Sequence, residues 1–234
     1  MNLTKHIPNL ITCLNLLAGM VGIHYVMVNG AVYGFYFILA AAIFDFFDGF
    51  AARMLGVHSE IGKQLDSLAD LVTFGVLPSF IVFMLIQSSE GPAYLPYIGF
   101  LIGIQSALRL AKFNIDERQT DRFIGLPTPA NALFFSTLPL MGQEMGILAG
   151  IWNNPWVLSA LTLIFSYLLT AELPLLALKF KHFGWNQNES RYLMLLISLA
   201  GIIIWGWAGI PIAVVSYIFL SLISNRLEKN EGET

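Results

Sequence analysis

Apolar segments of about 20 residues make up most of this chain, and short polar or Gly- and Pro-containing breaks separate them. A helix needs about 20 apolar residues to cross the hydrocarbon core of a membrane, because it rises only about 1.5 Å per residue. The mean hydropathy of +0.70 and the charged fraction of 12% agree with repeated crossings. We therefore expect an all-α polytopic membrane bundle and not a soluble domain with a large core.

The breaks divide the chain into about eight membrane-spanning helices within a single integral-membrane domain, residues 1–234. The N-terminal sequence lacks the small-residue cleavage site of a signal peptide, so the first apolar segment is predicted to be a retained span. The break at residues 207–209 separates the last two helices. The predicted helices are 9–28, 32–53, 62–86, 95–114, 126–142, 157–178, 191–207 and 210–226.

All 12 basic side chains fall at the same end of this arrangement of helices. They are Lys5, Arg53, Lys63, Arg109, Lys112, Arg118, Arg122, Lys179, Lys181, Arg191, Arg226 and Lys229. Basic residues in short loops remain on the cytoplasmic side of a membrane. The pattern predicts cytoplasmic termini and an even number of spans.

Four aspartates stand in the sequence DFFDGFAARMLGVHSEIGKQLDSLAD, residues 45–70. Asp45 and Asp48 share one face of the second predicted helix, and Asp66 and Asp70 share one face of the third. The two helices run antiparallel across a short turn, so the rise per residue places Asp48 level with Asp66 and Asp45 level with Asp70. The sequence predicts four carboxylates at two depths, just inside the cytoplasmic surface.

Four carboxylates in an apolar setting need a counter-charge. One alternative is that the aspartates cap helices or pair with Arg53, Lys63 and Arg109. Carboxylates inside a membrane bundle are usually functional, however, and oxygen ligands suit Mg²⁺ or Mn²⁺. Two such ions about 3.5 to 4 Å apart commonly hold phosphate groups during a displacement reaction. The spacing alone indicates metal and phosphate chemistry at the cytosolic face.

Other classes of protein fit the pattern less well. A cation transporter normally holds its ion near the membrane midplane on broken helices, whereas these aspartates lie near one face. An intramembrane prenyltransferase also uses aspartate pairs on a metal-bound diphosphate, but its two motifs lie far apart in sequence, whereas 17 residues separate Asp48 from Asp66 here. A non-catalytic scaffold has little use for such a stripe of metal ligands.

The motif reads Asp45-x-x-Asp48-Gly49-x-x-Ala52-Arg53, then eight residues, then Gly62-x-x-x-Asp66-x-x-x-Asp70. It resembles the signature of the CDP-alcohol phosphotransferases, which transfer a phosphatidyl group from CDP-diacylglycerol to an alcohol or a phosphoalcohol from a CDP-alcohol to a lipid. The resemblance implies a core of six helices, here followed by two C-terminal helices, and a homodimer surrounded by membrane lipids.

Three further stretches are similar to the bacterial branch of that family that uses L-serine: IPNLIT at residues 7–12, RLAKFN at 109–114 and FIGLPTPA at 123–130. This likeness implies that CDP-diacylglycerol and L-serine give phosphatidylserine and CMP in a bacterial inner membrane, with no nucleic-acid partner. Lys112 stands where the branch often has Arg. Glycerol phosphate or inositol phosphate remains a possible acceptor, and an archaeal ether lipid a possible donor.

The resemblance also implies a role for each candidate residue. Asp70 is expected to act as the general base and, with the other three aspartates, to bind two ions of Mg²⁺ or Mn²⁺. The expected metal ligands are Asp45, Asp48, Asp66 and Asp70. The expected nucleotide-binding residues are Gly49, Ala52, Arg53, Gly62, Asn9 and Thr12. The expected acceptor-binding residues are Arg109, Lys112, Asn114 and Arg122.

Overall fold

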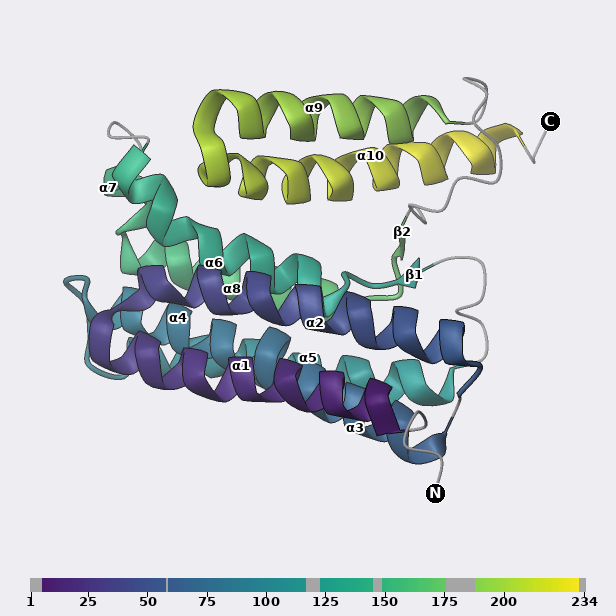
Figure 1. Cartoon of the computed structure of the whole chain (residues 1–234). Coiled ribbons are helices and arrows are strands. Elements are labelled where there is room, and N and C mark those ends of the chain that lie inside the picture. Colours follow the sequence, from purple (N-terminus) through teal and green to yellow (C-terminus); the bar gives the residue numbers. More distant parts are fainter. Residues whose placement is uncertain (1–5, 58, 117–122, 145–148, 176–187, 232–234) are drawn as a thin grey trace.

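The computed structural model is a bundle of long helices and describes residues 6–57, 59–116, 123–144, 149–175 and 188–231 (Figure 1). Within those residues, the segments long and apolar enough to cross a membrane are Ile7–Asn29, Ala31–Leu55, Glu60–Gln87, Leu95–Ile115 and Arg191–Ser224. The last of these contains two helices that fold back on one another (Figure 1). The protein is a multi-pass integral membrane protein, as the apolar segments predict.

The first half of the bundle contains four helical segments, three of which change helix type. In chain order its elements are α1 (Ile7–Asn29), η2 (Ala31–Tyr33), α2 (Gly34–Leu55), α3 (Glu60–Asp70), η3 (Leu71–Val76), α4 (Leu77–Gln87), η4 (Leu95–Gly99) and α5 (Phe100–Ile115). Helix α2 ends where Gly56 adopts the left-handed conformation, with φ of 60°. Helix α3 begins at Ser59, whose hydroxyl oxygen accepts a hydrogen bond from the Gly62 backbone N–H at 3.0 Å. These two caps form the sharp turn between the aspartate-bearing helices.

The second half adds four longer helices, one short helix and a small strand pair. Its elements are β1 (Phe123–Ile124), α6 (Thr128–Glu144), α7 (Ala149–Trp152), α8 (Pro155–Thr170), β2 (Pro174–Leu175), α9 (Glu189–Trp205), η6 (Gly206–Gly209) and α10 (Ile210–Glu231). Strands β1 and β2 pair antiparallel, with Phe123 opposite Leu175. The sequence did not predict this strand pair.

The sequence placed the end of the sixth helix wrongly, at residue 178. Helix α8 ends at Thr170, because Ala171 is already extended with ψ of 141°. Pro174 cannot donate a helical hydrogen bond, and proline disfavours helical geometry in the residue before it. The Leu173 carbonyl instead accepts a hydrogen bond from Gly125 N–H at 2.9 Å. Residues 176–178 lie outside the described part of the chain.

Basic residues of the described chain gather at one end of the bundle, as the charge pattern predicts. Arg53 lies at the end of α2, Lys63 at the start of α3, Lys112 at the end of α5 and Arg191 at the start of α9. The start of α1 and the end of α10 lie at the same end (Figure 1). We call it the basic end.

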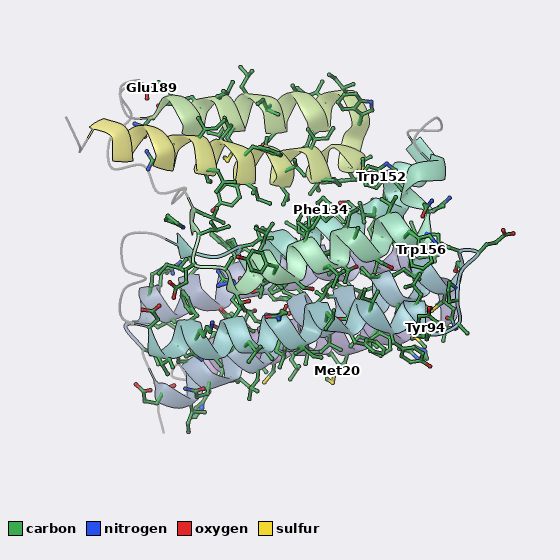
Figure 2. All side chains as sticks on the ribbon, turned by 180° about the vertical axis from the view of Figure 1, so that it is seen from behind. Met20, Tyr94, Phe134, Trp152, Trp156 and Glu189 are labelled. Carbon is green, nitrogen blue, oxygen red and sulfur yellow. The ribbon has the colours of Figure 1, made fainter. Side chains whose placement is uncertain are left out.

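Two apolar clusters hold the helices together. One joins α1, α2, η3, α4 and α6 through residues such as Val26, Ala41 and Phe74. The other joins α5, α6, α8 and α10, and within it the Phe134 and Phe165 rings stack with their centroids 4.0 Å apart. Figure 2 shows Phe134 between the bundle and the α9–α10 hairpin, and Met20 on the outer face of the bundle. Apolar side chains such as Met20, half exposed at 50%, suit contact with lipid.

Candidate active site

Helix α1 lies against α2, and the two helices run in opposite directions. The Thr12 hydroxyl donates a hydrogen bond to the Asp48 carboxylate at 2.7 Å, and both side chains are buried. Further along, Gly22 faces Phe37 so closely that an added Cβ would lie 2.8 Å from the Phe37 side chain. The contacts run in antiparallel order, so α1 fixes the depth of each residue on α2.

Helix α1 also lies against α3 and η3, and it runs parallel to them. The Asn15 amide donates a hydrogen bond to the Asp70 carboxylate at 3.3 Å. An added Cβ on Gly19 would lie 3.1 Å from the Thr73 Cα, and one on Gly62 would lie 3.0 Å from the Asn9 side-chain oxygen. Because Gly19 has no side chain, α1 can approach the backbone of η3 closely.

These contacts place the four aspartates on two levels. Thr12 bonds to Asp48, and Asn15, one helical turn deeper, bonds to Asp70. Asp66 lies one turn from Asp70 on α3, and Asp45 lies one turn from Asp48 on α2. Asp48 and Asp66 therefore lie at the depth of Thr12, and Asp45 and Asp70 lie at the depth of Asn15. This is the order that the sequence predicts.

Asp45, Asp48 and Asp66 form a compact group of carboxylates. One oxygen from each can be chosen so that all three atoms lie within 4.8 Å of one another. Asp48 is buried and the other two are half-buried. Asp70 stands outside this group, one turn deeper than Asp66.

The basic residues proposed as alternative partners have other contacts. Lys63 donates to the Asn114 carbonyl at 3.0 Å, and the Arg109 Nε donates to the Leu126 carbonyl. Across the residues that the structure describes, no Lys or Arg forms an ion pair with the three-carboxylate group. Three converging oxygen ligands without a cationic side chain suit a divalent metal ion. The group can therefore hold a metal of the Mg²⁺ or Mn²⁺ kind.

A segment of π-helix follows Asp70 directly. This segment, η3, precedes Pro78, whose missing N–H interrupts the α-helical hydrogen-bond pattern. The Thr73 hydroxyl donates to the Ala69 carbonyl at 2.9 Å, and the Ser79 hydroxyl donates to the Gly75 carbonyl at 2.8 Å. π-Helical turns are rare and often occur at functional sites, where they redirect side chains. The sequence predicted one uninterrupted helix here.

The proposed nucleotide-binding residues line the basic end of α1, α2 and α3. Arg53 folds back along α2, so that an added Cβ on Gly49 would lie 3.5 Å from an Arg53 guanidinium nitrogen. Arg53 is exposed, whereas Gly49 and Ala52 are half-buried. Asn9 lies beside Gly62. A phosphate above the three-carboxylate group would meet little side-chain bulk from Gly49 and Ala52.

Helix α5 runs antiparallel to α3 and η3 and fixes the depth of Arg109. Near the basic end, the Asn114 amide donates to the Ser67 hydroxyl at 2.9 Å. Deeper in the bundle, an added Cβ on Gly75 would lie 2.9 Å from the Ser106 Cβ. Arg109 lies between these two contacts, at about the depth of Asp70. Asn114 thus joins α5 to α3, and Arg122 lies outside the described residues.

A small pocket opens beside Arg109, at the junction of three elements. Its volume is about 40 Å³, and its walls are Arg109 and Lys112 from α5, Asp116 directly after α5, Ile124 from β1, and residues 169–172 at and just after the end of α8. None of the four aspartates lines it. Arg109 is only 6% exposed, and Tyr217 of α10 lies near it. The pocket and the three-carboxylate group are separate features of the basic end.

Three notable polar residues were not predicted. Asn15 continues the face of α1 that carries Thr12 and Gly19, so the 3–4 residue spacing of small and polar residues was its signal. Asn131 is fully buried on α6, and neither amide atom has a hydrogen-bond partner in the described structure. The sequence feature that could have identified Asn131 is a single Asn within an apolar helix. Glu172 lines the pocket only because α8 ends early.

Comparison with known proteins identifies the class of enzyme. A family model described as CDP-alcohol phosphatidyltransferase matches residues 5–177. The chain belongs to this family. The match covers the elements from α1 to β2, which include the aspartate motif and the pocket, and the α9–α10 hairpin lies beyond it.

Several relatives of the enzyme are named CDP-diacylglycerol–serine O-phosphatidyltransferase. The Bacillus subtilis protein is 36% identical over 190 residues, which are 80% of this chain and 96% of that protein. The Helicobacter pylori protein is 30% identical over 82% of this chain and 80% of its own length. The Mycobacterium leprae protein is 28% identical over 91% of this chain and 72% of its own length.

Metal binding at the three-carboxylate group should be visible in thermal stability. We expect Mn²⁺ at about 100 times its Kd to raise the melting temperature of the purified enzyme by roughly 5 to 10 °C. In Asp66→Asn this increase should be largely lost, while the melting temperature in EDTA should not fall, because one of three like charges is removed. Glu60→Gln, an exposed change on the same helix, is the control. A normal Mn²⁺ response in Asp66→Asn would place the metal elsewhere.

Proposed function

We propose that the enzyme transfers the phosphatidyl group of CDP-diacylglycerol to L-serine, giving phosphatidylserine and CMP. The observation that carries the proposal is the convergence of α1, α2 and α3 on one group of carboxylates, with the buried Arg109 of α5 at about the depth of Asp70. The names and extensive similarity of the relatives support serine as the acceptor.

The donor site lies at the basic end of α1, α2 and α3. Asp45, Asp48 and Asp66, with a contribution from Asp70, hold two ions of Mg²⁺ or Mn²⁺. When bound, the ions neutralise the diphosphate of CDP-diacylglycerol and the charge that develops on the departing CMP. The nucleotide lies over the surface formed by Gly49, Ala52, Arg53, Gly62, Asn9 and Thr12. Thr12 keeps Asp48 in position through its hydrogen bond.

Asp70 acts as the general base. Its carboxylate accepts the proton of the serine hydroxyl as the serine oxygen bonds to the phosphorus that carries the diacylglycerol. The bond from that phosphorus to the bridging oxygen breaks, and CMP leaves with the electron pair. Asp70 suits this role because it stands outside the compact group of three ligands and the Asn15 amide orients it.

The acceptor carboxylate binds Arg109 and Lys112. Arg109 donates to Leu126 through Nε alone, and no other protein hydrogen bond of its guanidinium occurs within the described chain. Its terminal nitrogens are therefore available to a carboxylate, and Arg suits that partner because its donors form a planar fork. Asn114 supports this site indirectly by holding α5 against α3. We also propose Arg122 as an acceptor-binding residue, from its position in the sequence.

The active site faces the cytosol, where serine is available, and both termini lie on the same side. The basic end supports this orientation, because Lys and Arg in short loops remain cytoplasmic. Relatives of the chain come from bacteria, and we place the enzyme in the bacterial inner (cytoplasmic) membrane. The enzyme acts as a homodimer among membrane lipids.

The direct test is CMP release by the purified enzyme from CDP-diacylglycerol with Mn²⁺ or Mg²⁺. We expect release to depend on both the metal and L-serine. Glycerol phosphate and inositol phosphate, offered at equal concentration, should give a much lower rate. If the enzyme prefers glycerol phosphate or inositol phosphate, that compound is the acceptor in place of serine. If none of the three acceptors leads to CMP release, the proposal is contradicted.

Replacement of the base should separate chemistry from binding. Asp70→Asn retains the shape and one oxygen of the side chain but cannot readily take up a proton. We expect metal-dependent binding of CDP-diacylglycerol to persist while kcat falls by roughly 10² to 10⁴. Asp48→Asn, measured alongside, should lose liponucleotide binding itself. Near-normal turnover in Asp70→Asn would exclude it as the base, and lost binding would make it primarily a metal ligand.

A further inference from the structure

The pocket beside Arg109 contains both signs of charge. Arg109 and Lys112 contribute positive charges from α5, whereas Asp116 and Glu172 contribute negative charges from the end of α5 and the segment after α8. The Thr170 hydroxyl, which donates to the Gln105 side-chain oxygen at 3.0 Å, adds a polar group. Ile124, Leu169 and Ala171 form the apolar part of the wall.

Backbone hydrogen bonds hold the walls of this pocket together. The Gly125 N–H donates to the Leu173 carbonyl and the Leu126 N–H to the Leu168 carbonyl, both at 2.9 Å. Gly125 has φ of +77°, and an added Cβ there would lie 2.7 Å from the Leu169 carbonyl oxygen. The Arg109 Nε reaches the Leu126 carbonyl in the same loop. The loop thus fixes the end of α8, and with it Glu172, relative to α5.

This distribution of charge suits an α-amino acid better than a phosphorylated alcohol. An α-amino acid carries a carboxylate and an ammonium group on one carbon atom, so two cations and two carboxylates around a small pocket match both ends of it. Glycerol phosphate and inositol phosphate carry negative charge alone. Asp116 and Glu172 would repel them, and repulsion of the wrong ligand is an effective means of specificity.

We propose that Glu172, assisted by Asp116, binds the ammonium group of the acceptor serine and rejects anionic acceptors. The proposal rests on the proposed function and extends it from the carboxylate of serine to its amino group. Glu172 is exposed, and it lines the same pocket as Arg109 and Lys112. A simpler arrangement, in which Asp116 only neutralises Lys112 one helical turn away, is an outcome that the experiment separates.

The test compares two acceptors in the CMP-release assay with full-length enzyme, CDP-diacylglycerol and Mn²⁺. L-Serine carries the ammonium group, and 3-hydroxypropanoate is the same molecule without it. In Glu172→Gln we expect the KM for serine to rise roughly ten- to hundredfold, the range for loss of a hydrogen bond between charged groups, with little change in kcat. The kinetics with 3-hydroxypropanoate should stay the same or improve.

Two further variants complete the experiment. Glu172→Asp, which keeps the charge, should recover part of the serine affinity, even if Glu172→Gln proves unstable. Glu90→Gln, the same change at an exposed residue in the α4–η4 connection, should behave as the wild type.

An unchanged serine KM in both Glu172→Gln and Asp116→Asn would overturn the inference and leave Asp116 as a neutralising partner of Lys112. A serine KM in Glu172→Asp no better than in Glu172→Gln would also overturn it. Failure of the wild type to use serine at all would instead contradict the proposed function.

Discussion

The structure depends on holding like-charged carboxylates close together inside an apolar bundle. Charged groups of one sign repel, and burial removes the water that would screen them. Helix α1 resolves the geometric part of this problem, because it bonds to Asp48 through Thr12 and to Asp70 through Asn15. Small residues such as Gly19 allow the close approach. The electrostatic part requires a cation, and the described side chains provide none in an ion pair with the three-carboxylate group.

At the basic end, different sets of elements form the three-carboxylate group and the pocket beside Arg109. In the proposed function, the donor binds to α1, α2 and α3, and the acceptor binds to α5, the segment just after β1 and the end of α8. Helix α5 connects them, because it contacts α3 through Asn114 and reaches Leu126, just after β1, through Arg109. A membrane enzyme that joins a lipid nucleotide to a small water-soluble alcohol needs such a connection, since the two substrates approach from different phases.

Much of this arrangement was predictable, because helical periodicity determines which residues share a face. The depths of Asp45, Asp48, Asp66 and Asp70 follow from rise per residue and a short turn, and the contacts of α1 agree. The early end of α8 did not follow, because it depends on Pro174 and on hydrogen bonds to the distant Gly125 loop. The same long-range contact brings Glu172 to Arg109, which no local pattern indicates. The π-helix after Asp70 was not predicted either, although Pro78 lies just beyond it; Gly19 and Ser106 pack closely against this segment.

We propose above that Asp45, Asp48 and Asp66 hold the metal to which the diphosphate binds. Anomalous X-ray scattering from crystals of the enzyme grown with Mn²⁺ and CDP-diacylglycerol tests it most directly. We expect strong manganese peaks between these three carboxylates, about 2.0 to 2.3 Å from their oxygens, with diphosphate oxygens as further ligands. Diphosphate bound at the basic end with no manganese between the three aspartates would contradict it.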